Sequence, residues 1–201
     1  MQKRMFRDKY GLTSLVLLGQ KTQTRDIIKV KIPDTCLDFP DFDSWDIERK
    51  IAKFNSEKQS LIARPKYHIG EVVAVAQSYQ KAYPNADFEM VDKWTFMTES
   101  AGWKNKMFVR PDLMPHAIKI TKIRFEKLQD ISEEDCLKEG ILKSDKYAMP
   151  YGITEKVAPN CVFFFYKTPK EAFAALIDKI NGYGTWESNP YLFVYDFELV
   201  K

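Results

Sequence analysis

Residues 117–126 alternate apolar and polar side chains almost without a break. A period of two residues is typical of a β-strand that turns one face to a core and the other to solvent. Residues 71–76, which follow Gly70, are mostly apolar on both faces and predict a strand in a barrel wall or at the centre of a sheet. Residues 191–200 predict a third strand, so a sheet is the expected framework of the fold.

The sequence also predicts a few short helices, each bounded by residues that favour helix ends. Ser132 opens a capping signature, so a helix should run from there to about Glu139. Thr168 precedes a proline at the first helical position and opens another helix, which should end at residues 181–182. That helix should bury Phe173, Leu176, Ile177 and Ile180, and further helices are expected at residues 12–19 and 46–57.

These elements predict an α+β fold. Few helices, three strands and long connections are typical of a small β-barrel decorated by short helices rather than of a parallel α/β sheet. A chain of 201 residues is long for one domain and short for two. A chain of this length buries about 70% of its extended-chain surface and needs neither disulfides nor a metal to fold.

Composition and spacing disfavour several kinds of protein. No apolar stretch approaches the roughly 18 residues of a membrane span, and none has the pattern of a signal sequence. Cys36, Cys136 and Cys161 are far apart, and His68 and His116 have no partner at the spacing of metal ligands. We therefore expect a cytoplasmic protein in a reducing compartment, without a metal, a cofactor or a membrane partner.

The net charge of +3 conceals an uneven distribution. Residues 1–31 carry eight basic and two acidic side chains, whereas residues 32–48 carry six acidic side chains and no basic one. A basic segment suits an anionic ligand such as a nucleotide or RNA. Two solvated surfaces explain the same pattern, and charge alone favours that interpretation.

Residues 19–25, Gly-Gln-Lys-Thr-Gln-Thr-Arg, concentrate hydroxyls and cations after a glycine that can cap the helix expected before it. Such side chains can donate hydrogen bonds to phosphate or carbonyl oxygens, although a polar edge strand has the same composition. Glu139 falls in the last turn of its predicted helix, where the helix dipole disfavours an anion by up to about 1 kcal/mol. A carboxylate at that position either occurs by chance or interacts with another part of the fold.

Residues 19–25 resemble the G-x-K-x-x-T-x-R-like signature of the ASCH domain, a PUA-like β-barrel family. Residues 67–73, 128–141 and 181–190 also resemble the larger bacterial and phage members of that family. The resemblance implies a PUA-like barrel with a ligand cleft beside the Lys-Thr segment. Domains of this family are generally regarded as RNA-binding modules.

The smallest bacterial ASCH proteins, however, are amidohydrolases that deacetylate N4-acetylcytidine with a lysine, a threonine and a glutamate. Lys21, Thr24 and Glu139 match these three residues by motif. Because the resemblance reaches both ends of the chain, it implies one elaborated domain, residues 1–201. This chain departs from the small enzymes in being about twice as long, with long insertions at 33–66, 80–110 and 142–168. It also has Arg25 directly after the threonine, where one residue intervenes in the enzymes.

The chemistry implied by that match begins with attack of the Thr24 hydroxyl on the acetamide carbonyl, with Lys21 taking the proton and Glu139 orienting the pair. Lys21 then needs a lowered pKa, from burial or from a nearby cation such as Arg25. On a flat strand, residues 21 and 24 point to opposite faces. If both act together, the backbone at 21–24 must be a turn.

Three functions remain open from the sequence. The first is a binding domain for RNA or a modified nucleotide, and the second is an amidohydrolase acting on an N-acylated pyrimidine nucleoside. The third is a phage-borne protein-interaction module that uses the acidic residues 34–48. Expected ligand contacts are Lys21, Thr22 and Arg25 from the motif, Lys104 and Arg110 as phosphate contacts, and Tyr79, Trp103 and Trp186 as stacking surfaces for bases, each of which has a purely structural alternative.

Overall fold

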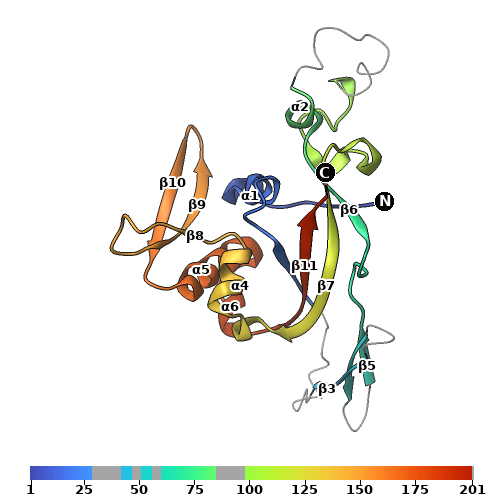
Figure 1. Ribbon diagram of the computed structural model, residues 1–201, viewed down its shortest axis with the longest axis vertical. Helices are drawn as coiled ribbons and strands as arrows, with labels where there is room; N and C mark the ends of the chain where they lie inside the picture. Colours follow the sequence, from blue (N-terminus) through green and yellow to red (C-terminus); the bar gives the residue numbers. More distant parts are fainter. Residues whose placement is uncertain (29–41, 47–50, 56–59, 85–97, 201) are drawn as a thin grey trace.

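The computed structural model describes the chain except for residues 29–41, 47–50, 56–59, 85–97 and 201. A mixed five-stranded sheet forms its centre, in the order β1-β6-β7-β11-β2 (Figure 1). Only β1 and β6 run parallel; the other neighbours are antiparallel. The strands are β1 (Gln2–Arg4), β2 (Gln23–Ile27), β6 (Val72–Val75), β7 (Ala117–Lys127) and β11 (Tyr191–Leu199), so all three predicted strands are confirmed.

The helices begin and end where the capping residues predict. The Ser132 hydroxyl accepts a hydrogen bond from the Asp135 N–H (3.1 Å) at the start of α4, and the Thr168 hydroxyl accepts one from the Glu171 N–H (3.2 Å) at the start of α5. Gly19 has a φ of +70° just after α1, the conformation that a glycine adopts without steric cost. The helices are α1 (Leu12–Leu17), α2 (Tyr79–Ala82), α4 (Glu133–Lys138), α5 (Pro169–Asn181) and α6 (Thr185–Ser188), with short 3-10 turns η1 (Asp8–Tyr10), η2 (Lys106–Phe108), η3 (Pro111–Leu113) and η4 (Leu128–Asp130).

Two smaller sheets come from the long insertions. β8 (Leu142–Lys143), β9 (Tyr151–Val157) and β10 (Asn160–Tyr166) form one of them, and β3 (Phe42–Asp46), β4 (Ile51–Asn55) and β5 (Ser60–Ala63) form the other. The helix predicted at 46–57 is therefore wrong in the part that is described, because β4 pairs with both β3 and β5. Hydrogen bonds to two neighbouring strands outweigh the weak helix propensity of this polar stretch.

The main core lies between the central sheet and helices α1, α4 and α5. Phe173, Leu176 and Ile177 of α5 are buried there as predicted, whereas Ile180 is only partly buried. No helix among the described residues is long and apolar enough to cross a membrane. In the same part of the chain, no cluster of three or more histidine, cysteine or carboxylate side chains has the arrangement of a metal site.

The two edges of the central sheet approach each other. Arg4, on β1, donates from Nη1 to the carboxylate of Asp26 on β2, with an Nη1–Oδ1 distance of 2.6 Å, and from Nη2 to the hydroxyl of Thr24 (2.9 Å). A side chain can span the gap between opposite edge strands only if the sheet is strongly curled. In the described part of the chain β1 and β2 share no backbone pairing, so no closed barrel is found. The combination of sheets and short helices confirms the predicted α+β class.

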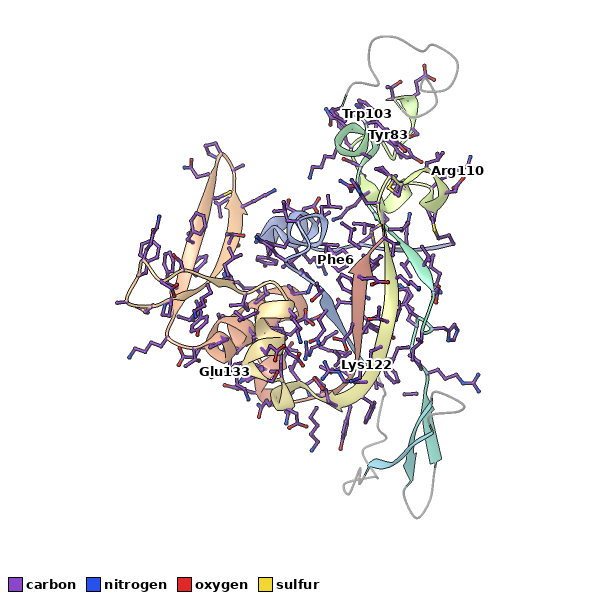
Figure 2. The ribbon with its side chains drawn as sticks, in the orientation of Figure 1. Phe6, Tyr83, Trp103, Arg110, Lys122 and Glu133 are labelled. Carbon is purple, nitrogen blue, oxygen red and sulfur yellow. The ribbon has the colours of Figure 1, made fainter. Side chains whose placement is uncertain are left out.

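A second, smaller core holds Ala74, Ala76, Tyr79, Val109 and Met114. In Figure 2 it occupies one end of the molecule, where Tyr83 and Trp103 lie close together.

Asp8 ties this end to the N-terminal segment. Its carboxylate accepts hydrogen bonds from Lys106 (2.8 Å), Lys81 (3.0 Å) and the Thr13 hydroxyl. Burial raises the pKa of Asp8, but these hydrogen bonds outweigh it and lower the pKa to about 2.

Asp8 should make the stability of the fold depend on pH in the acid range. A carboxyl pKa of 3.8 in the unfolded chain and about 2 in the folded one stabilises the fold fully above about pH 4, and this stabilisation is lost as the pH falls toward 2. We expect Asp8→Asn to cost about 1–2 kcal/mol at pH 7, discounted for partial exposure, and progressively less toward pH 2.5. Urea unfolding at several pH values between 2.5 and 7 measures this loss of stability, with Asp145→Asn, which changes an exposed carboxylate, as the control. A cost that stays constant with pH would contradict this role for Asp8.

Candidate functional site

A cavity of about 620 Å³ lies beside the free edge of β2. This volume is within the range of about 300–1,000 Å³ that is usual for small-molecule sites. The chain that leads from β1 into η1, the edge of β2 and the end of α5 form its walls. The lining residues are 4–7, Leu12, Lys21, 24–27, Lys66, Glu139, Ile177, Ile180 and Asn181.

Lys21 is held by three hydrogen bonds inside this cavity wall. Its Nζ donates to Glu139 Oε2 (2.5 Å), to the Glu139 backbone oxygen (2.8 Å) and to the Gln23 backbone oxygen (2.7 Å). Three acceptors match the three donors of an ammonium group. The backbone N–H of Lys21 also donates to Leu15 O in α1 (3.0 Å), so the turn after that helix fixes where the side chain starts.

Glu139 joins two buried cations. Its Oε1 accepts from Arg25 Nη1 (2.7 Å), while Oε2 accepts from Lys21. Arg25 donates further to Glu126 Oε1 (2.9 Å) and Gln23 Oε1 (2.5 Å). The side chains of Lys21, Arg25 and Glu139 are at most 8% exposed. Two neighbouring cations therefore offset the unfavourable position of Glu139 at the end of α4.

The environment of Lys21 favours its neutral form more than water does. Burial lowers the pKa of Lys21 below 10.5; the nearby Arg4 and Arg25 act in the same direction, and Glu139 opposes them in part. A lysine with a lowered pKa gains a fraction of neutral amine that can accept a proton.

Thr24 lines the same cavity from within β2. Its hydroxyl is buried and its oxygen accepts a hydrogen bond from Arg4 Nη2 (2.9 Å), which leaves its own proton available for donation. Among the described residues no hydrogen bond joins Thr24 to Lys21. Lys21 precedes β2 on irregular backbone, so the alternation of a strand does not force its side chain away from Thr24.

The backbone of β2 also faces the cavity. On either side of β2, Ile28 N–H donates to Tyr191 O (3.0 Å) and Phe197 N–H donates to Thr22 O (2.9 Å). The even-numbered residues of this segment therefore point their backbone N–H and C=O groups toward β11. In an antiparallel pair the alternate residues point their N–H and C=O groups the other way. The backbone groups of Arg25 and Ile27 therefore lie on the free edge of the sheet, where a ligand can reach them.

Several predicted contact residues lie outside the cavity. Thr22 uses its backbone to join Lys138 (3.0 Å) and β11, and its side chain does not line the space. Tyr79 is buried in the second core with Trp103 beside it, and Figure 2 shows Trp103 well away from Phe6, which does line the cavity. The remaining three are Lys104, which is exposed, Arg110, which pairs with Asp112 (2.6 Å), and Trp186, which packs edge-on against Phe173 with ring centroids 6.2 Å apart.

Other lining residues had no individual signal in the sequence. Arg4 and Arg7 belong to the basic N-terminal segment, but no motif connects them with residues 21–25. Asp26 and Lys66 were likewise not singled out. Arg4 reaches Thr24 only because the sheet curls, and no local pattern reports that.

Comparisons with protein-family models, with curated proteins and with solved structures found no match for this chain. The residues around the cavity are therefore the observations from which a function can be proposed.

Proposed function

We propose that the cavity binds a nucleoside or nucleotide with a modified pyrimidine base, free or within RNA, and that the chain is an ASCH-like protein of PUA-like fold. The observation that carries the proposal is the buried Lys21–Glu139–Arg25 bridge in the wall of a ligand-sized cavity that Thr24 also lines. Buried charges are costly unless they are paired, and perturbed ionisable groups gathered in a cavity are characteristic of functional sites.

The other lining residues suit a flat, polar-edged ring. Phe6, Leu12, Ile177 and Ile180 offer apolar surface for the ring faces. The free-edge N–H and C=O groups of β2, with the Thr24 hydroxyl, offer donors and acceptors for the ring edge. Sites for small ligands combine these two features.

An amidohydrolase that deacylates an N4-acetylcytidine-like nucleoside is the second candidate. The observation that favours it is the lowered pKa of Lys21, which lines the same cavity as the buried hydroxyl of Thr24. Thr24 Oγ1 would form an ester with the acyl carbon, its proton passing to neutral Lys21 through the ligand or a water molecule. The pyrimidine amine would leave with that proton, and water would hydrolyse the ester. Arg4, which already donates to Thr24 Oγ1, would stabilise negative charge developing on that oxygen.

The protein-interaction module has less support. Residues 34–41 and 47–48 of the acidic segment lie outside the described residues, and β3 is the part of it that is described. The cavity therefore remains the better candidate for the functional site.

Calorimetric titration with N4-acetylcytidine, cytidine and a short single-stranded RNA tests the proposal. We expect a nucleoside to bind, and Lys21→Met to weaken binding at least about tenfold because Glu139 loses a buried partner and the cavity wall that the bridge holds is altered. Lys104→Met, which removes an exposed lysine outside the cavity, is the control. Absence of nucleoside and RNA binding, or an equal effect of both variants, would reject the proposed site; circular dichroism checks that each variant is folded.

A further inference from the structure

The charged residues around the cavity fall into an inner and an outer group. In the inner group every cation has a carboxylate partner: Lys21 and Arg25 contact Glu139 at 2.5 and 2.7 Å, and Arg4 contacts Asp26 at 2.6 Å. Arg25 also contacts Glu126, a carboxylate outside the cavity, at 2.9 Å. The inner charges are thus compensated within the protein, so they do not require a ligand of opposite charge.

The outer group consists of Arg7 and Lys66, both exposed. Among the described residues neither has a carboxylate within ion-pair distance. The cavity as a whole is lined by five cationic side chains (Arg4, Arg7, Lys21, Arg25 and Lys66) and two anionic ones (Asp26 and Glu139), a net charge of +3. Two of these three excess charges therefore lie with side chains that solvent can reach, and the third is offset by Glu126 outside the cavity.

Both side chains start from well-fixed backbone. The Arg7 carbonyl accepts hydrogen bonds from the Tyr10 and Leu12 N–H groups (both 3.2 Å), and Phe6 beside it is buried. Lys66 donates its backbone N–H to the Tyr195 hydroxyl (2.7 Å), and its Nζ lies 5.0 Å from the centroid of the Tyr67 ring. Cations on fixed backbone lose less conformational freedom when they close on an anion.

We propose that the ligand carries one phosphate group, held at the outer part of the cavity by Arg7 and Lys66 while its base lies deeper, against Phe6 and the edge of β2. This inference rests on the proposed nucleotide-binding function and specifies the ligand as a mononucleotide. A phosphate monoester has a charge of about −1.5 to −2 at neutral pH, which two cations balance. A longer nucleic acid presents a phosphate at every residue and needs a continuous basic track.

The affinities of cytidine and of its 5′- and 3′-monophosphates, measured by calorimetry at low and high salt, test this inference. We expect one of the monophosphates to bind at least about tenfold more tightly than cytidine at low salt, with a smaller difference at high salt. Arg7→Gln and Lys66→Gln should each remove most of that difference, with a much smaller effect on the affinity for cytidine. Lys104→Gln, which removes an exposed lysine elsewhere, should preserve it.

The outcomes separate the phosphate site from the function it rests on. Equal affinities for cytidine and both monophosphates would overturn the phosphate site and leave the nucleoside cavity standing. Failure of all three ligands, with N4-acetylcytidine and the short RNA also failing, would remove the proposed function itself. An oligonucleotide that binds more tightly than either mononucleotide, with a salt dependence that reports several phosphate contacts, would overturn the choice of a mononucleotide.

Discussion

Glu139→Gln should lower the free energy of unfolding by about 3–5 kcal/mol at pH 7. The substitution keeps the size of the side chain and removes the charge that Lys21 Nζ and Arg25 Nη1 share at 2.5 and 2.7 Å. Two buried cations are then left close together, and an amide oxygen accepts a hydrogen bond without neutralising either. Arg25 retains Glu126, so most of the loss falls on Lys21.

Urea unfolding followed by circular dichroism measures this effect. Glu134→Gln is the matched control, because Glu134 lies on α4, the helix that ends just before Glu139, is 76% exposed and forms a surface ion pair with Lys138. Adding Lys21→Met to Glu139→Gln should recover part of the loss, since the uncompensated charge is removed. A loss below about 1 kcal/mol for Glu139→Gln would mean that the bridge is not a buried charge cluster.

Thr24→Val should abolish any deacylation of N4-acetylcytidine, with a fall of at least about 10³-fold in kcat, because the attacking oxygen is removed. Valine matches threonine in shape, and Arg4 keeps its contacts with Asp26, so the fold and the cavity should persist. Binding of the nucleoside should change much less than kcat, since the hydroxyl supplies only one of several contacts.

Thr22→Val provides the matched control for this experiment, because Thr22 lies two residues earlier and its side chain is outside the cavity. Chromatographic detection of free cytidine measures turnover. Turnover that survives Thr24→Val, or falls equally with Thr22→Val, would exclude Thr24 as nucleophile. If the wild-type protein binds the nucleoside and releases no cytidine, the binding function remains and the hydrolase does not.

The parts of the fold that the sequence predicted are those that local patterns encode. The alternation at 117–126 and the caps at Ser132 and Thr168 depend on neighbouring residues, and β7, α4 and α5 follow them closely. The error at 46–57 arose where pairing with two other strands overrides local propensity. The parallel pairing of β1 with β6 joins residues about 70 positions apart, and no local pattern encodes it.

The candidate site was likewise only partly predictable from the sequence. Lys21, Thr24, Arg25 and Glu139 were singled out together through a family resemblance, and the structure brings all four to one cavity. Arg4 was not singled out from the sequence, because its contacts with β2 arise from the curl of the sheet. The aromatic residues expected to stack on bases lie outside the cavity: Tyr79 is buried in the second core, Trp103 packs against that core, and Trp186 packs against the main one. Composition alone cannot separate a stacking ring from a packed one.

The location of ligand binding is the central claim, and amide chemical shifts of the ¹⁵N-labelled protein titrated with N4-acetylcytidine test it most directly. We predict saturable shifts concentrated at residues 4–7, 21–27, 139 and 177–181, with none in the β9–β10 hairpin or around Trp103. No shifts at high ligand concentration, or shifts confined to that hairpin or to the Tyr79–Trp103 core, would contradict the assignment of the cavity as the functional site.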